Sequence, residues 1–294
     1  MSLFEWFWEK VTKPMDEKRI KTLRVPTVAR EDNDISYLES THKLQLLDVY
    51  SPSESNEKMP TIVDIHGGGW YYGDKDLNKI YCLNLVERGF KVVNVSYRLT
   101  PEVTLKEQVQ DICSALNYVY DNAEKLGVDL SNLFLTGDSA GAHLSAMIVN
   151  LMQDEKMQKV FEVELKPTFK AVTYTCAAFY ISKLATTPIV RSYFTSLLGK
   201  KAGESPLFPY VDYRADFARI PSLFITSDGD FMKGQTIRGY NEAKNNGVDA
   251  ELIYIMEKDQ VNKLTHVFNV IQPDWEESKV TNDKTVEFFK KYID

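Results

Sequence analysis

The 294-residue sequence predicts an α/β fold with a mostly parallel central sheet that helices cover on both faces. Short runs rich in β-forming residues alternate with longer amphipathic stretches, and this alternation is typical of repeated strand–helix units. Several of the short runs, such as residues 61–65, are apolar almost throughout, as expected for strands that are buried on both faces. The length suits one large α/β domain, so we expect a single domain over residues 1–294.

The individual elements follow from this alternation. Strands are predicted at the β-forming runs, residues 44–50, 61–66, 91–95, 132–136, 170–175, 222–226 and 250–255. Helices are predicted at the amphipathic stretches, residues 77–88, 105–125, 140–151, 235–246 and 282–292. Asp64 stands inside the second predicted strand, and the sequence alone does not explain a carboxylate in an otherwise apolar run.

Two segments lie outside the alternation and are candidate caps over the central body. Residues 1–21 contain a candidate N-terminal helix, predicted over residues 3–20, whose largest apolar side chains lie mostly on one side: Leu3, Phe4, Trp6, Phe7, Trp8 and Val11. We expect this helix to pack against the body rather than lie in a membrane surface, because its polar face mixes both signs of charge. Residues 177–213 are irregular and aromatic, and they are too long for a plain loop.

The composition is that of an ordinary globular protein, with 44% hydrophobic and 26% charged residues. A net charge of −7 argues against a nucleic-acid partner. Cys82, Cys113 and Cys176 are widely spaced and odd in number, so neither a disulfide framework nor a metal-binding cysteine pattern is expected. The chain has no apolar run of the ~20 residues that a membrane span needs, and its N-terminus lacks the basic start of a signal peptide. We therefore expect a cytoplasmic protein.

The most informative motif is the pentapeptide Gly-Asp-Ser-Ala-Gly at residues 137–141. It follows a predicted strand and precedes a predicted helix, which is the setting in which a G-x-S-x-G sequence forms a sharp turn that exposes the serine hydroxyl. The glycines of the motif leave space for this turn. The motif therefore predicts a serine hydrolase with Ser139 as its nucleophile.

A serine nucleophile needs a base within hydrogen-bond reach. The chain has four histidines, His42, His66, His143 and His266. In the sheet fold to which the motif belongs, the acid and then the histidine follow the serine along the chain, which leaves only the last two. His143 lies one turn beyond Ser139 on the same predicted helix, so we expect it to support the turn. His266 follows the last predicted strand and is the expected base.

The acid is expected directly after the predicted strand at residues 222–226, where Asp228 and Asp230 both stand. Position alone leaves both open, and the other residue is expected to stabilise the turn. A glycine run at residues 66–70, His-Gly-Gly-Gly-Trp, follows another predicted strand and has the form of a hydrolase oxyanion loop. The glycines let the backbone approach a substrate oxygen closely, and the N–H of Ala140 is a further donor. His66 is expected to be a structural hydrogen-bonding residue of this loop.

Three motifs together resemble the hormone-sensitive-lipase-like esterases of the α/β-hydrolase superfamily. They are the glycine run at residues 66–70, Tyr-Arg-Leu-Thr-Pro-Glu at residues 97–102 and the pentapeptide at residues 137–141. The resemblance extends from about Asp48 to the C-terminus, and it implies an α/β-hydrolase fold. The chain departs from the family where a Pro-rich segment usually follows Tyr97 and Arg98, and where a glycine usually follows the histidine. These departures leave the substrate open.

Carried over residue by residue, the resemblance implies a nucleophile, a base and three oxyanion donors: Ser139, His266, Gly68, Gly69 and Ala140. It favours Asp230 over Asp228 as the acid, because an apolar residue usually follows the acid in this family and Phe231 follows Asp230.

These residues predict a carboxylic-ester hydrolase that acts on small, short-acyl esters through an acyl-enzyme, without a metal or cofactor. Aromatic residues beside the motifs are candidates to line the pocket: Trp70, Tyr71, Tyr72, Phe231 and Phe268. An amide-cleaving relative, such as an arylformamidase or a small peptidase, would use the same triad. A non-catalytic small-molecule binder and a lipase that acts at membrane surfaces through its N-terminal aromatic residues are further alternatives. The resemblance also suggests a homodimer.

Overall fold

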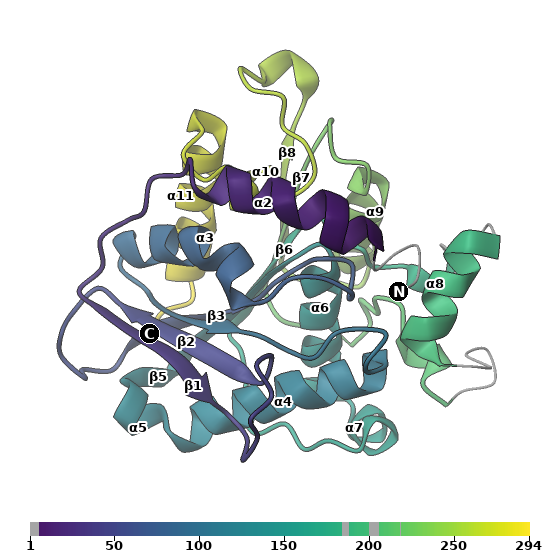
Figure 1. Ribbon diagram of the computed structural model, residues 1–294, viewed down its shortest axis with the longest axis horizontal. Coiled ribbons are helices and arrows are strands. Elements are labelled where there is room, and N and C mark those ends of the chain that lie inside the picture. Colours follow the sequence, from purple (N-terminus) through teal and green to yellow (C-terminus); the bar gives the residue numbers. More distant parts are fainter. Residues whose placement is uncertain (1–5, 184–187, 200–205, 218) are drawn as a thin grey trace.

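The computed structural model describes residues 6–183, 188–199, 206–217 and 219–294. Within these residues, eight strands form one sheet in the order β1-β2-β4-β3-β5-β6-β7-β8 (Figure 1). Their bounds are Arg30–Ser36, Leu46–Ser51, Met59–Ile65, Lys91–Val95, Val128–Asp138, Ala171–Thr175, Ser222–Ser227 and Ala250–Ile255 for β1 to β8. β1 and β4 each pair with β2 in antiparallel fashion, and the other neighbouring strands are parallel. The predicted α/β fold with a mostly parallel sheet is confirmed.

Helices cover both faces of this sheet. α3 (Lys75–Glu87), α10 (Phe268–Ile271) and α11 (Glu276–Lys290) contact one another on one side. The other side carries α4 (Leu105–Asp121), α6 (Ala140–Gln153) and α9 (Lys233–Asn245), and Figure 1 shows α3 and α4 on opposite sides of the strands. Adjacent residues of a strand pack into different layers: Ile62 belongs to the core cluster that includes α3, and Val63 to the cluster that includes α4. This two-sided burial is the reason that the central strands are nearly continuous apolar runs.

The seven predicted strands all occur close to their predicted positions, but β1 was not predicted. Its sequence is Arg-Glu-Asp-Asn-Asp-Ile-Ser, which lacks any apolar alternation. β1 lies at an edge of the sheet, where one side is free of neighbours and polar residues are favoured. Propensity and periodicity therefore give no signal for this strand.

The helices also show specific differences from the prediction. The helix expected over residues 105–125 is split at Asn122 into α4 and the short α5 (Ala123–Leu126), and α11 begins before residue 282. α7 (Glu155–Phe161) and α10 were not predicted. The segment 177–213 was expected to be irregular, yet it contains η2 (Ile181–Lys183), the eleven-residue α8 (Pro188–Leu198) and η4 (Phe208–Tyr210). Parts of that segment, residues 184–187 and 200–205, lie outside the described residues.

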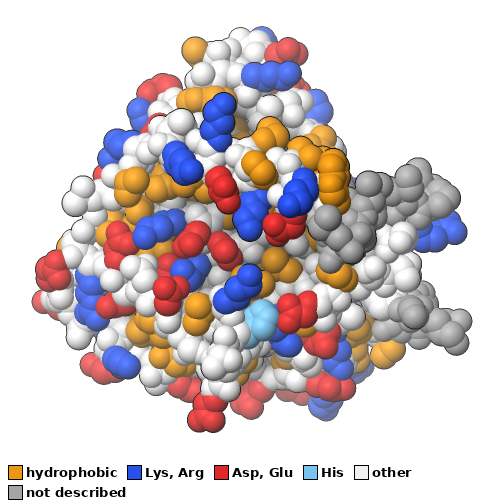
Figure 2. All heavy atoms as spheres, viewed as in Figure 1, with side chains coloured by type: hydrophobic (Ala, Val, Ile, Leu, Met, Phe, Trp, Pro, Cys, Tyr) orange, Lys and Arg blue, Asp and Glu red, His pale blue; other side chains and the backbone are white. Residues whose placement is uncertain are grey.

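The N-terminal segment is helical from Trp6 through η1 (Trp8–Thr12) and α2 (Lys13–Ile20), and Leu3 to Glu5 lie outside the described residues. The helix runs across the molecule above α3 (Figure 1). Figure 2 shows basic and acidic side chains interspersed over this face. The remaining connection, η5 (Glu257–Asp259), follows β8. All three cysteines are buried free thiols. No helix within the described part of the chain has the length and apolar character that a membrane crossing demands.

Candidate active site

Ser139 stands at a sharp turn between β5, which ends at Asp138, and α6, which begins at Ala140. Its backbone has φ +51° and ψ −114°, an uncommon conformation for a residue with a side chain. The Ser139 N–H donates to the Thr175 carbonyl at 2.8 Å, so β6 holds the turn in place. A Cβ on Gly141 would collide with the Ile65 carbonyl of β3. The glycine is therefore required because α6 begins in direct contact with the neighbouring strand.

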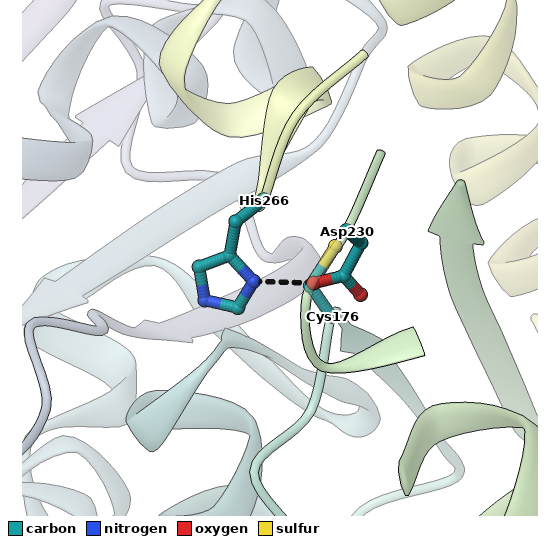
Figure 3. Close-up of side chains that lie close together, drawn as sticks. All are labelled: Cys176, Asp230 and His266. Carbon is teal, nitrogen blue, oxygen red and sulfur yellow. Dashed lines mark hydrogen bonds and ion pairs between the residues drawn. The ribbon is translucent and has the colours of Figure 1, made fainter. Parts of the chain in front are cut away.

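His266 connects this serine to a buried carboxylate. Its Nε2 lies 2.8 Å from Ser139 Oγ, and its Nδ1 lies 2.6 Å from Asp230 Oδ1. Figure 3 shows the imidazole pointing at this carboxylate. Thr226 Oγ1 donates to the other carboxylate oxygen at 2.7 Å, and the Met232 N–H donates to Oδ1 at 2.8 Å. With Nδ1–H donating to Asp230, the lone pair of Nε2 faces the serine hydroxyl.

The pKa of Asp230 reflects two opposing effects. Burial works to raise it, but the hydrogen bond and charge of His266, with the bonds from Thr226 and Met232, hold the pKa below its ordinary value. The carboxylate therefore stays ionised, as a group that orients an imidazole and stabilises its protonated form must be.

Asp228 lies two residues away but has different partners. Lys233 Nζ donates to Asp228 Oδ1 at 2.8 Å, the Glu257 N–H donates to Oδ2 at 2.7 Å, and the Tyr254 hydroxyl also donates to Oδ1. The hydrogen bond from Lys233, with those from Tyr254 and Glu257, lowers the pKa of Asp228. The Asp228 carboxylate therefore stabilises the turn after β8. Of the two aspartates, only Asp230 forms a hydrogen bond with His266 within the described residues.

Cys176 lies next to Asp230 and His266, and one ligand atom of each lies within 4.8 Å of the others. Three such atoms suggest a metal site. The surroundings oppose one, because Asp230 and His266 already bond to each other and burial raises the pKa of the Cys176 thiol well above its usual value. The sulfur instead accepts the N–H of Val267 at 3.2 Å. Val267 has a left-handed backbone, φ +52°, so this contact fixes the turn that carries the imidazole.

The glycine loop after β3 is held by its carbonyl groups. His66 Nδ1 donates to the Gly67 carbonyl at 2.7 Å, and the Tyr71 and Tyr72 N–H groups donate to the Gly68 carbonyl at 3.2 and 3.0 Å. In a trans peptide the carbonyl and the next N–H point in opposite directions. These bonds therefore turn the N–H groups of Gly68 and Gly69 away from the anchors. A third N–H, that of Ala140, is free of intrahelical acceptors because it begins α6.

Both histidines next to these groups are structural in their contacts. The His66 ring is buried and stacks on Tyr97 with 4.4 Å between centroids, and the Tyr97 hydroxyl donates to the His66 carbonyl at 2.8 Å. His143 Nδ1 accepts from Trp70 Nε1 at 3.3 Å, and its Nε2 donates to the Val211 carbonyl at 2.7 Å. Burial lowers the pKa of His143 to about 4, so the ring is neutral at ordinary pH. Neither nitrogen of His143 faces Ser139.

The carboxylate that the sequence does not explain belongs to a buried cluster under the serine turn. Asn78 Nδ2 donates to Asp64 Oδ2 at 2.9 Å and to Asp138 Oδ1 at 2.8 Å. Asp138 Oδ1 also accepts the Gly67 N–H at 3.0 Å. The cluster thus joins the residue before Ser139 to the glycine loop. Burial, with the charge of Asp138, raises the pKa of Asp64 to about 8. Asn78 was not singled out in the sequence, although the anomalous Asp64 was a signal for this cluster.

A cavity of about 1060 Å³ opens over Ser139 and His266. Of the predicted pocket residues, Trp70, Tyr72 and Phe231 line it, and the Phe231 ring lies 4.3 Å from the His266 ring. The prediction is corrected for two residues. Tyr71 packs against the core and stacks on Tyr193, and Phe268 is fully buried beside α3, so neither lines the cavity. The N-terminal helix and α8 also contribute aromatic side chains: Trp6, Phe7, Trp8, Tyr193 and Phe194.

The family assignment follows from a sequence comparison. Residues 47–209, more than half of the chain, match the family model described as BD-FAE. The chain belongs to the BD-FAE family. Among solved structures, this BD-FAE protein is similar to esterase B from Lactobacillus rhamnosis in its structure with a C4-C4 SN3 tributyrin phosphonate. The TM-score is 0.91 at 29% identity, and the match covers 98% of this chain and 94% of that one. The α/β-hydrolase fold and the resemblance to its esterases are confirmed.

Curated relatives match over shorter stretches. Carboxylesterase NlhH of Mycobacterium tuberculosis is 37% identical over 107 residues, which cover 36% of this BD-FAE protein and 34% of the relative. Kynurenine formamidase of Drosophila melanogaster is 30% identical over 144 residues, covering 48% of this chain and 44% of the relative. The chain therefore spans less than half of the length of these curated relatives.

Proposed function

We propose that this BD-FAE protein is a serine hydrolase that cleaves small carboxylic esters. The observation that carries the proposal is the continuous line of hydrogen bonds from Ser139 through His266 to Asp230, which opens into a largely apolar cavity of about 1060 Å³. A hydroxyl, an imidazole and an ionised carboxylate in this order can activate the hydroxyl as a nucleophile.

The chemistry follows from this geometry. Ser139 Oγ attacks the acyl carbon while His266 Nε2 takes the hydroxyl proton, and Asp230 stabilises the imidazolium that forms. The N–H groups of Gly68, Gly69 and Ala140 stabilise the oxyanion. His266 then gives the proton to the departing alcohol, which leaves an acyl-enzyme. In the second half of the cycle, His266 takes a proton from water, the hydroxide attacks the acyl carbon, and Ser139 is regenerated as the acid departs.

Ser139→Ala tests this function directly. The variant is expected to lose hydrolysis of p-nitrophenyl butyrate and of tributyrin, and to lose labelling by a fluorophosphonate, because no hydroxyl remains to form the covalent intermediate. Ser131→Ala removes an exposed serine from the same strand and is the matched control, with activity expected to equal that of the wild type. Equal ester turnover by Ser139→Ala and the wild type would overturn the assignment.

An amide-cleaving function is the second candidate, because kynurenine formamidase is among the relatives and the same triad serves both reactions. Rates on p-nitrophenyl esters and on p-nitroanilides of the same acyl groups separate the two. Higher kcat/KM for the anilides would replace the ester proposal. A short acyl group, a single domain with two caps, a homodimer and a cytoplasmic location stay predictions of the sequence.

A further inference from the structure

The Gly69 carbonyl has a different kind of anchor from the rest of the glycine loop. The carbonyls of residues 66, 67, 68 and 70 accept hydrogen bonds from residues 66–108, which belong to the central body. The Gly69 carbonyl instead accepts a hydrogen bond from the Tyr193 hydroxyl. Tyr193 lies on α8, inside the segment that leaves the body between β6 and β7. One peptide of the loop therefore depends on a segment outside the body.

The contact between Tyr193 and the loop is reinforced from the loop side. The Tyr71 hydroxyl donates to the Tyr193 carbonyl at 2.8 Å, and the two rings stack with 4.3 Å between centroids. Ring, carbonyl and hydroxyl of Tyr193 thus all contact residues 69–71. A second connection runs from Trp70 through His143 to the Val211 carbonyl, near the end of the same segment. The segment that carries α8 therefore contacts the glycine loop at two places.

The N-terminal helix reaches the same glycine. The Trp8 ring stacks on Tyr72 at 5.4 Å between centroids, with only 8° between the planes. A Cβ on Gly69 would stand 2.5 Å from the Tyr193 hydroxyl and 2.9 Å from the Trp8 ring. Gly69 is thus enclosed by two segments that are about 185 residues apart in the chain. Since its φ is +60°, the close approach and the backbone conformation both favour glycine here.

The same side chains also form the wall of the cavity. Trp8, Tyr193 and the neighbouring Phe194 line it together with Ser139 and Gly69. A substrate group that fills this part of the cavity must therefore contact the residues that hold the glycine loop. Binding energy from a non-reacting part of a substrate raises kcat when it is used to position the reacting groups.

We propose that Tyr193 is a positioning residue that couples filling of the cavity to alignment of the glycine loop. The protein then discriminates between substrates of different length through kcat rather than through KM. The proposal rests on the proposed ester hydrolysis. A longer substrate group contacts α8 and the N-terminal helix, the Tyr193 hydroxyl fixes the peptide that follows Gly69, and this holds the adjacent Gly69 N–H in position toward the oxyanion.

Tyr193→Phe removes the hydroxyl and keeps the ring, and Tyr180→Phe is the matched control. The Tyr180 hydroxyl donates to Glu242 Oε2 at 2.7 Å, away from the glycine loop. Both variants are compared with the wild type on p-nitrophenyl esters from acetate to octanoate. Loss of one hydrogen bond that acts in the transition state lowers a rate about tenfold. We expect kcat of Tyr193→Phe to fall about tenfold for the ester that the wild type turns over fastest, and less for acetate. KM should change less than about twofold, and Tyr180→Phe should follow the wild type.

A boronic acid inhibitor, whose boron becomes tetrahedral when Ser139 Oγ adds to it, gives an independent measure of how well the oxyanion donors are aligned. Its Ki should rise in Tyr193→Phe by about the same factor as kcat falls, because both depend on the oxyanion donors. Equal kcat values for the two tyrosine variants, or a change confined to KM, would overturn the coupling while ester hydrolysis by the wild type stands. A wild type that neither hydrolyses esters nor reacts with a fluorophosphonate would remove the function and the coupling together. Should Tyr193→Phe fail to fold, the wild-type series decides: length dependence in KM alone refutes the proposal.

Discussion

Asp64→Asn is expected to flatten the dependence of stability on pH. The substitution keeps the shape of the side chain and removes a carboxyl group that is 1% exposed in the native protein. Burial, with the nearby charge of Asp138, raises the pKa of Asp64 from 3.8 to about 8. The unfolded chain loses this proton near pH 4, as an ordinary aspartate does. Between these values the native state therefore holds a proton that the unfolded state has released.

The sign and size of the pH dependence follow from this difference in bound protons. The free energy of unfolding falls as pH rises wherever the native state binds more protons, by ~1.4 kcal/mol per pH unit for one proton. The stabilisation is complete below the unfolded pKa and is lost progressively up to about pH 8. Between about pH 5.5 and about pH 7.5, the ionisation of Asp64 should thus lower the free energy of unfolding of the wild type by at most about 3 kcal/mol. Burial also raises the pKa of Asp138, so this residue too makes the free energy of unfolding fall as pH rises.

The assay is urea unfolding, followed by tryptophan fluorescence at several pH values, for the wild type and the variant. Asp121→Asn makes the same substitution at an exposed carboxylate at the end of α4, which pairs with Lys166, and is the surface control. The curve for Asp64→Asn should be flatter than those of the wild type and of Asp121→Asn. Parallel curves for all three proteins would refute the argument, because Asp64 would then be ionised in the native state.

Two further predictions concern the candidate site. Gly68→Ala should lower kcat on p-nitrophenyl butyrate by ~10²–10³ with little effect on KM. The backbone at φ +108° disfavours a side chain, and the new Cβ would collide with the Tyr72 carbonyl. A kcat near that of the wild type would contradict the role of this loop. Asp230→Asn should lower kcat by ~10⁴, because the amide can donate to Nδ1 and so favours the wrong tautomer of His266, and because the charge that stabilises the imidazolium is lost. Asp228→Asn should lower kcat less than about tenfold, because the partners of Asp228 are Lys233 and the turn after β8. Equal losses in steady-state kcat would return the role of acid to Asp228.

Much of the fold could be predicted because its signals are local. Central strands are apolar over their whole length, and the helices between them repeat apolar residues at helical spacing. β1 escaped prediction because an edge strand does not need this pattern. α8 was not predicted, although its apolar residues recur at helical spacing, because it is short and stands inside a segment that was expected to be irregular as a whole.

The candidate site divides in the same way. The serine turn and the glycine loop are written in short motifs, because each needs particular residues at adjacent positions. The order of serine, acid and histidine along the chain follows from the sheet fold to which the serine motif belongs. The tertiary structure alone brought together the cluster of Asp64, Asn78 and Asp138, and the contact of Tyr193 with Gly69. It also placed Asp230 and not Asp228 against His266, a choice that position in the sequence left open and the family resemblance favoured. These contacts join residues that are 14 to 124 positions apart. No local pattern encodes them, because a hydrogen bond between distant residues depends on how the whole sheet and its covering segments bring two backbones together.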